Sequence, residues 1–222
     1  MNIERLKFSP YLEGLLEDHN APDEISAETT LNTLQDIEPT SSDAANQLLT
    51  LKERFALGWC ALALNKQKDF QDLGHLQSRF ADASIDVALR IAWHQETKAL
   101  KLKSLPTNPL GIFILGLGKL GGVDLNFSSD VDLVAFYDPE TLPIPEHIGQ
   151  SYVVNKILKT MSQILKPRNS SRFVWRVDWR LRPEASSTQL AMSLDMAQDF
   201  YFFRALPWHR LALMKALSLI HI

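Results

Sequence analysis

The spacing of apolar residues divides the chain into a helical first part and a mixed second part. From Ala44 to Lys103 apolar side chains recur at steps of three and four, and no proline interrupts them. The polar and small residues Gln71 to Gly74 predict a break, so two long antiparallel helices are expected here. Their apolar faces are predicted to be core: Leu48, Leu51, Phe55, Trp59 and Leu62 on the first helix, and Leu76, Phe80, Ile85, Ala88 and Ile91 on the second.

Residues 20–43 precede these helices and are rich in proline, serine, threonine and acidic side chains. This composition predicts a loop or a short irregular helix. Ser42 or Asp43 is expected to cap the first long helix.

The pattern changes after Lys103, where prolines end the helical region. Three short apolar segments are β-prone. Two helices are also predicted, the second with a break at Pro207. The strands are expected at Gly111–Leu117, Val131–Tyr137 and Phe173–Asp178, and the helices at Glu146–Leu165 and Leu194–Lys215.

These elements predict an α+β fold. An N-terminal helical bundle would cover residues 1–103. A domain with a small mixed sheet and flanking helices would cover residues 104–216.

Composition limits the class of function. Of the 222 residues 45% are hydrophobic and 22% charged, as in ordinary soluble globular proteins, and the net charge of −3 offers no electrostatic footprint for nucleic acid. The N-terminus does not look like a signal peptide, and the longest uncharged run, 104–118, is too short to span a bilayer. No nucleic-acid or membrane partner is therefore expected. The single cysteine, Cys60, lies in an apolar helical stretch; it is predicted to be buried and suits a cytoplasmic location.

A glycine-rich turn follows the first predicted strand. Gly116, Gly118 and Gly121 have the G-x-G-x-x-G spacing of dinucleotide-binding proteins and kinases. Only seven residues separate Gly122 from Asp130, too few for the crossover helix of a dinucleotide fold. The downstream kinase motifs and the P-loop pattern are absent from the sequence. The glycine spacing alone therefore indicates neither class.

Two carboxylates start the next predicted strand. Because side chains alternate along a strand, Asp130 and Asp132 are expected on the same face. Paired carboxylates favour a divalent cation between them, and Mg²⁺ commonly binds one or two carboxylates together with phosphate oxygens. The backbone N–H groups of residues 118–122 would then cradle a phosphate.

A third carboxylate, Asp178, ends the predicted strand Phe173–Asp178. Three acids on neighbouring strands can hold two metal ions that clamp a phosphoryl group. Arg180 and Arg182 alternate with Asp178 and are predicted to offset phosphate charge.

These motifs resemble those of the nucleotidyltransferase superfamily that includes DNA polymerase beta. The stretches GLGKLGGVDLNFSSDVDL and RVDWRLRPEASSTQL are similar to the glutamine synthetase adenylyltransferase family, over about residues 112–216. The helical region 44–103 fits that family only in general character. Family members carry two such domains in a chain several times longer. The motifs L-N-F-S-S-D and R-V-D-x-R-L-R-P resemble those of the N-terminal, deadenylylating copy. So does their position, about a hundred residues after the initial Met.

The resemblance implies an enzyme that removes AMP from a tyrosine of glutamine synthetase by phosphorolysis, yielding ADP. Asp130, Asp132 and Asp178 match the catalytic metal ligands, which the resemblance implies hold two Mg²⁺ ions. The implied nucleotide and phosphate contacts are Gly118, Lys119, Gly121, Gly122, Ser128, Ser129, Arg180 and Arg182. Two alternatives remain: AMP transfer from ATP to a protein tyrosine, and a non-catalytic fragment that binds glutamine synthetase.

The resemblance also implies regulation by a PII-type signal protein, through regions expected to lie outside this chain. Two departures from the family pattern stand near the end. His209 occupies a position where the family commonly has glutamate, and residues 217–222 (LSLIHI) are expected to be a non-native tail.

Overall fold

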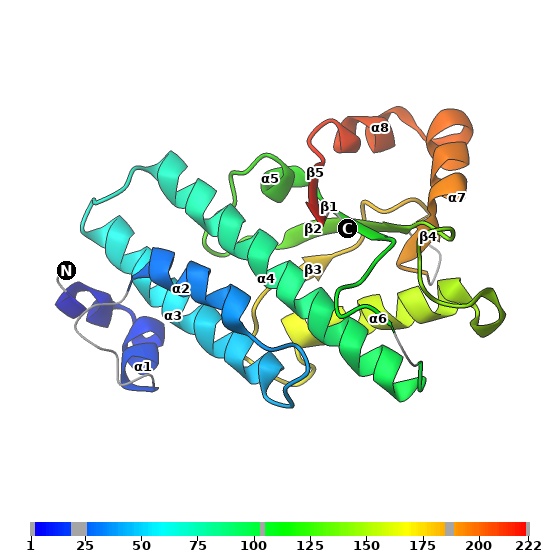
Figure 1. Cartoon of the computed structure of the whole chain (residues 1–222). Coiled ribbons are helices and arrows are strands. Elements are labelled where there is room, and N and C mark those ends of the chain that lie inside the picture. Colours follow the sequence, from blue (N-terminus) through cyan, green and yellow to red (C-terminus); the bar gives the residue numbers. More distant parts are fainter. Residues whose placement is uncertain (1–2, 19–25, 103–104, 185–188, 221–222) are drawn as a thin grey trace.

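The computed structural model describes residues 3–18, 26–102, 105–184 and 189–220. Figure 1 shows long helices beside a small sheet. The helical elements are η1 (Ile3–Phe8), α1 (Pro10–Asp18), α2 (Ala27–Thr33), η2 (Leu34–Asp36), α3 (Ala44–Leu64), α4 (Phe70–Ala99), α5 (Gly118–Gly121), η3 (Glu146–Ile148), α6 (Gln150–Leu165), α7 (Leu194–Asp199), the π-helical η4 (Phe200–Arg204) and α8 (Pro207–Leu213). The strands are β1 (Ile112–Gly116), β2 (Val131–Tyr137), β3 (Val177–Asp178), β4 (Ala191–Ser193) and β5 (Leu217–Ile220). The α+β prediction is confirmed.

The two long predicted helices are α3 and α4, but the break between them was placed too late. The helices are separated at residues 65–69, and Gln71 to Gly74 lie inside the first turns of α4. The Asp69 side chain accepts a hydrogen bond from the Asp72 backbone N–H at 2.8 Å, so it caps the helix N-terminus. This cap fixes the start of α4.

Three other local predictions can be compared with the structure. The predicted cap of α3 is confirmed only in position, because Asp43 occupies the N-cap but its side chain makes no capping hydrogen bond. Cys60 is buried and is not in a disulfide. The predicted break at Pro207 is present, because α8 begins at this residue.

The sheet is mixed and has the order β3-β2-β1-β5, with β4 also pairing with β2. β1 runs antiparallel to both β2 and β5, whereas β3 and β4 run parallel to β2. The predicted strand at Phe173–Asp178 is shortened to β3, because the Val174 and Trp175 N–H groups donate to the Leu165 carbonyl at 2.8 and 3.1 Å. Of the predicted tail, residues 217–220 form β5, and the last two residues lie outside the described chain.

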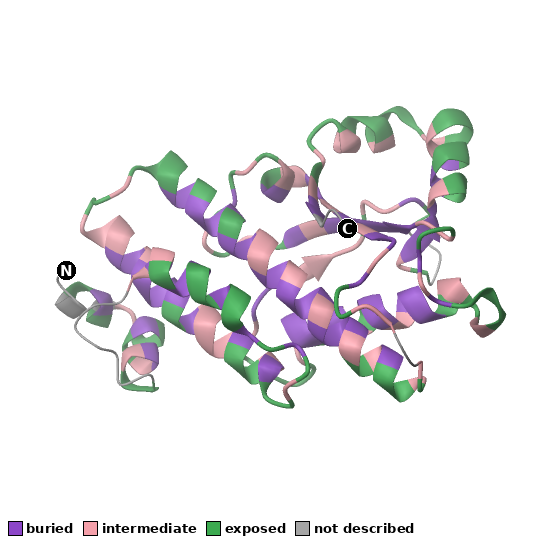
Figure 2. Ribbon diagram, in the orientation of Figure 1, coloured by how far each residue is buried: buried purple, intermediate pink, exposed green. Residues whose placement is uncertain are grey.

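Both faces of the sheet are covered. One large buried cluster joins α3, α4 and α6 to the sheet and contains Phe55, Phe80, Leu133 and Trp175. A smaller cluster on the other face, around Val134, packs beneath α7 and α8 (Figure 1). Figure 2 shows the buried side of α4 turned toward its neighbours, whereas α8 has no buried residue. None of the described helices is long and apolar enough to cross a membrane.

Candidate active site

The glycine turn joins the ends of β1 and β2 and lies against the first predicted carboxylates. The Leu117 N–H donates to the Asp132 carbonyl at 2.9 Å, and the chain then makes the single helical turn α5. Gly118 has a φ of +55°, and a Cβ there would lie 2.5 Å from Asp132 Oδ2. A Cβ on Gly121 would lie 1.7 Å from the Lys215 carbonyl oxygen. These two glycines are therefore required by close approach of the chain.

The remaining residues of the turn are less constrained. Gly122 is exposed, and a Cβ there would have no neighbour closer than 3.5 Å. Lys119 is also exposed, which leaves its ammonium group accessible to a ligand.

The predicted carboxylates meet where β2 begins. Asp132 lies opposite Asp178 in the parallel β2–β3 register, and alternation along β2 places Asp132 on the face that α7 and α8 cover. The pKa of Asp132 is raised, first by burial and then by the charges of Asp178 and Asp130, against an opposing effect of Arg180. The three carboxylates therefore form one electrostatic group.

Two arginines partly neutralise this group. Arg180 donates to the Asp178 carboxylate from its backbone N–H and from Nε, each at 2.8 Å, and this pairing lowers the pKa of Asp178. Arg176 pairs with Asp130 and donates to the Ser128 carbonyl at 2.7 Å. The sequence interpretation missed Arg176, although its alternation with Asp178 in the FVWRVD stretch was a usable signal.

The other predicted residues make backbone hydrogen bonds or line a separate cavity. Arg182 donates to the carbonyls of Trp179 at 2.7 Å and Gln189 at 3.0 Å, so it ties together the two ends of the segment after β3. Ser128 and Ser129 lie in the turn that leads into Asp130, where the Ser129 N–H donates to the Asn126 carbonyl at 3.2 Å. Both serines line a cavity that extends away from the sheet toward α1 and α3.

The carboxylates suit a divalent cation by their chemistry. Hard oxygen ligands are those that Mg²⁺ prefers, and among the described residues no side chain pairs with the Asp132 carboxylate. Across all the residues that the structure describes, no three His, Cys, Asp or Glu side chains are arranged closely enough to form a metal-ligand set. Asp130 and Asp178 instead face arginines. These carboxylates would have to exchange an arginine for a cation.

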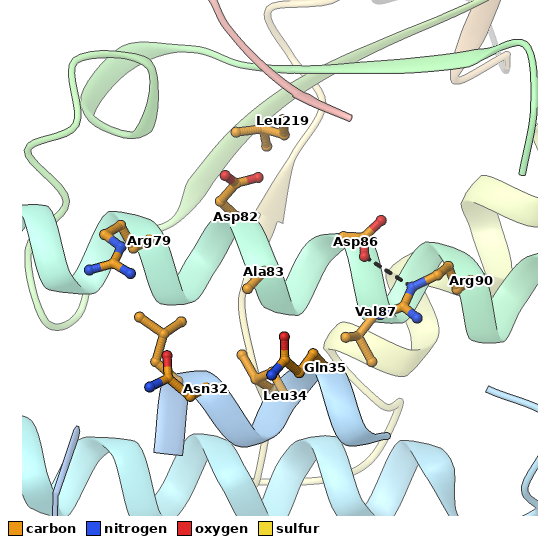
Figure 3. Close-up of a pocket in the computed structure, with 11 residues that line it drawn as sticks. Asn32, Leu34, Gln35, Arg79, Asp82, Ala83, Asp86, Val87, Arg90 and Leu219 are labelled. Atoms are coloured by element: carbon orange, nitrogen blue, oxygen red, sulfur yellow. Dashed lines mark hydrogen bonds and ion pairs between the residues drawn. The ribbon is translucent and has the colours of Figure 1, made fainter. Parts of the chain in front are cut away.

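A second concavity lies far from these residues in the sequence. It is lined by α2, η2, α4 and Leu219 of β5, and Figure 3 shows Asn32 below Arg79 at one end and the Asp86–Arg90 ion pair at the other. None of the predicted site residues lines it.

Comparison with known proteins agrees with the motifs. A family model described as glutamate-ammonia ligase adenylyltransferase matches residues 6–221. Three relatives carry the name bifunctional glutamine synthetase adenylyltransferase/adenylyl-removing enzyme. The one from Rhizobium meliloti (strain 1021) is 38% identical over 143 residues, which are 63% of this chain and 14% of the relative. That from Caulobacter vibrioides (strain ATCC 19089 / CIP 103742 / CB 15) is 35% identical over 183 residues, 81% of this chain and 19% of the relative.

The relative from Agrobacterium fabrum (strain C58 / ATCC 33970) is 32% identical over 187 residues, 82% of this chain and 19% of the relative. The aligned part of the chain thus spans at most 19% of these three relatives. The family match covers nearly the whole of this chain, including the glycine turn and all three carboxylates. The chain therefore belongs to the glutamate-ammonia ligase adenylyltransferase family.

Proposed function

We propose that this chain carries a nucleotidyl-transfer site that acts on glutamine synthetase, and that its reaction is phosphorolytic removal of AMP from a modified tyrosine. The observation that carries the proposal is the placement of Asp132 opposite Asp178 and directly against Gly118. Carboxylates and a glycine turn in contact provide a cation-binding edge beside a backbone that a phosphate can approach closely.

In this reaction an oxygen of inorganic phosphate attacks the phosphorus of the tyrosine-linked AMP. A phosphorus–oxygen bond to phosphate forms while the bond to the tyrosine oxygen breaks, and the proton of the hydrogen phosphate ion passes to that oxygen, so the products are ADP and a tyrosine hydroxyl. The work of the protein is to position the reactants and to offset charge on the transferred group.

The residues of the site would divide this work. Asp130, Asp132 and Asp178 would hold Mg²⁺, two ions in this proposal, and Mg²⁺ would supply charge neutralisation on the phosphoryl oxygens. Gly118 and Gly121 allow the backbone of the turn to approach a phosphate closely, with exposed Lys119 beside it.

Arg176 and Arg180 keep the carboxylate group partly neutral when no cation is present, because each is paired with one of its members. If the carboxylates held a cation, Arg176 and Arg180 would be free to donate to the phosphoryl group instead. This exchange gives the arginines a part in both states of the site.

The opposing modification, AMP transfer from ATP to the tyrosine with release of pyrophosphate, is the second candidate, because the relatives' name includes both activities. The test uses the 222-residue chain, Mg²⁺ and either adenylylated glutamine synthetase with phosphate or unmodified glutamine synthetase with ATP. Release of ADP in the first reaction supports the proposal. AMP incorporation in the second supports transfer from ATP, and binding without turnover in either would assign the chain a binding role only.

Three further assignments belong to the same proposal. The chain would act in the cytoplasm, glutamine synthetase would be its protein partner, and a PII-type signal protein would act through regions outside residues 1–222. Co-purification of the chain with glutamine synthetase checks the first partner assignment, and the signal protein should not co-purify with residues 1–222 if the second is right.

A further inference from the structure

A cavity of about 660 Å³ lies between the N-terminal helices and the segment that leads into β3. Its walls come from α1, from α3, from residues 127–129 and from residues 171–176. A volume of this size is typical of small-molecule sites. The aromatic side chains in its wall are Tyr11, Phe127, Phe173 and Trp175.

The wall also contains a buried amine without a hydrogen-bond partner. The Nζ atom of Lys52 is enclosed, and no described residue accepts a hydrogen bond from it. It lies 3.6 Å from the centre of the Trp175 ring and 5.6 Å from that of Phe80, so its surroundings are aromatic faces. A buried ammonium group without an anion is costly unless one is supplied. Burial lowers the pKa of Lys52 to about 7.

The neighbouring carboxylate is already engaged. Glu53 is 5% exposed and accepts two hydrogen bonds of 2.6 Å from Arg172 in a bidentate pair. Arg176, at the other side of the cavity, is paired with Asp130. Among the described residues, Lys52 is therefore the cation of this wall that has no carboxylate partner, and its charged form would be stabilised by one anionic group.

We propose that this cavity binds a small organic molecule that carries one carboxylate on an apolar or aromatic body, with the carboxylate paired to Lys52 Nζ. A single negative charge matches the single ammonium group, whereas a phosphate dianion would leave charge uncompensated among aromatic rings. The body of the ligand would pack against the aromatic wall. The bound molecule would also contact Ser128 and Ser129, which directly precede Asp130, and Arg176, which pairs with it.

The binding assay is calorimetric titration of the whole chain with phenylacetate, its neutral analogue phenylacetamide, and phenyl phosphate, at pH 6.5. Phenylacetate should bind one to one. The Kd of phenylacetate should be at least about tenfold higher for Lys52→Met than for the parent chain. The Kd of phenylacetamide for the parent chain should also be at least about tenfold higher than that of phenylacetate. Lys98→Met is the matched control, because Lys98 is exposed on α4 and lies outside the cavity lining. This variant should bind phenylacetate with the same Kd as the parent chain.

Three results would overturn the proposal. These are no binding of phenylacetate, equal binding of phenylacetamide, and an unchanged Kd in Lys52→Met. Tighter binding of phenyl phosphate would replace the carboxylate with a phosphate ester and would likewise reject the class proposed here. The assay measures binding and not turnover, so its outcome is independent of the proposed reaction.

A second variant keeps the test decisive if Lys52→Met does not fold. A Cβ on Gly14 of α1 would meet no atom within 4 Å, and Gly14 lines the cavity. Gly14→Phe should therefore place its ring in the cavity and abolish binding, while the circular dichroism spectrum stays unchanged. Unaltered binding in this variant would place the ligand elsewhere and reject the site.

The pH dependence gives a third measurement. Phenylacetate needs a charged Lys52, so Kd should rise about tenfold for each pH unit above 7. Burial raises the pKa of Tyr11, and burial raises that of Cys60 to about 11, so neither supplies this change. A Kd that stays constant from pH 6 to pH 8 would contradict the pairing. The other ionisable groups around the cavity and Lys52 are Asp18, Glu53, Arg172, Arg176 and, through Arg176, Asp130.

Discussion

Replacing Gly118 with alanine should displace the Asp132 carboxylate while the sheet stays in place. The new Cβ would lie 2.5 Å from Asp132 Oδ2, and ordinary van der Waals contact begins at 3.4 Å, so the carboxylate has to retreat by roughly 1 Å. A misplacement of this size costs about 100-fold in rate when it affects a positioned catalytic group. The φ of +55° adds about 1–2 kcal/mol of backbone strain to the folded state.

The assay is ADP release from adenylylated glutamine synthetase, with urea denaturation to measure the free energy of unfolding. Gly149→Ala is the matched control. Gly149 also has a positive φ, of +80°, but its Cβ would meet only the Tyr152 Cβ at 3.8 Å. Both variants should lose similar stability, and only Gly118→Ala should lose activity.

Two results would refute this reasoning. Full activity in Gly118→Ala would show that contact with Asp132 does not matter for the reaction. An equal loss of activity in both variants would attribute the defect to backbone strain alone.

Three further predictions concern the charged groups. Folding raises the pKa of Asp132, so the folded state binds more protons than the unfolded state and stability falls as pH rises through the two pKa values. Asp132→Asn should thus be inactive yet more stable than the parent at pH 7, with no gain near pH 3; a loss at pH 7 would contradict the sign. Arg172→Met should lower the free energy of unfolding by about 2–3 kcal/mol in urea, because buried Glu53 loses its bidentate partner. The double variant with Glu53→Gln should lose less, and equal losses would reject the explanation. Arg176→Met should lower ADP release while the free energy of unfolding falls by under about 1 kcal/mol. Arg204→Met, which breaks another surface ion pair, should keep full activity.

The sequence was sufficient for elements that are defined by local pattern. The bounds predicted for β2, Val131–Tyr137, are those observed, because a continuous apolar run follows a turn and ends at an Asp-Pro pair. The long helices were also predictable, since their apolar faces repeat over many turns. The α3–α4 break was misplaced because one side chain, Asp69, decides where the second helix begins.

Contacts between distant segments were beyond local patterns. The alternation in FVWRVD predicts a longer strand, but Val174 and Trp175 bond instead to the end of α6. The Asp130–Arg176 pair spans 46 residues, and the position of Lys52 over Trp175 depends on how α3 packs against the segment before β3. The sequence therefore indicated which acids to expect and left their cationic partners undetermined.

The shortness of β3 has a consequence for the energetics of the site. Asp178 is held opposite Asp132 by a ladder of only two residues, next to the bond from the Val131 N–H to the Arg176 carbonyl. Just upstream, Val174 and Trp175 are buried and anchored to α6. A local opening can therefore release Asp178 while the core stays folded, at a small fraction of the free energy of global unfolding. Assembly of the three carboxylates is then an equilibrium of its own, and any ligand that bound only the assembled group would shift the equilibrium toward it.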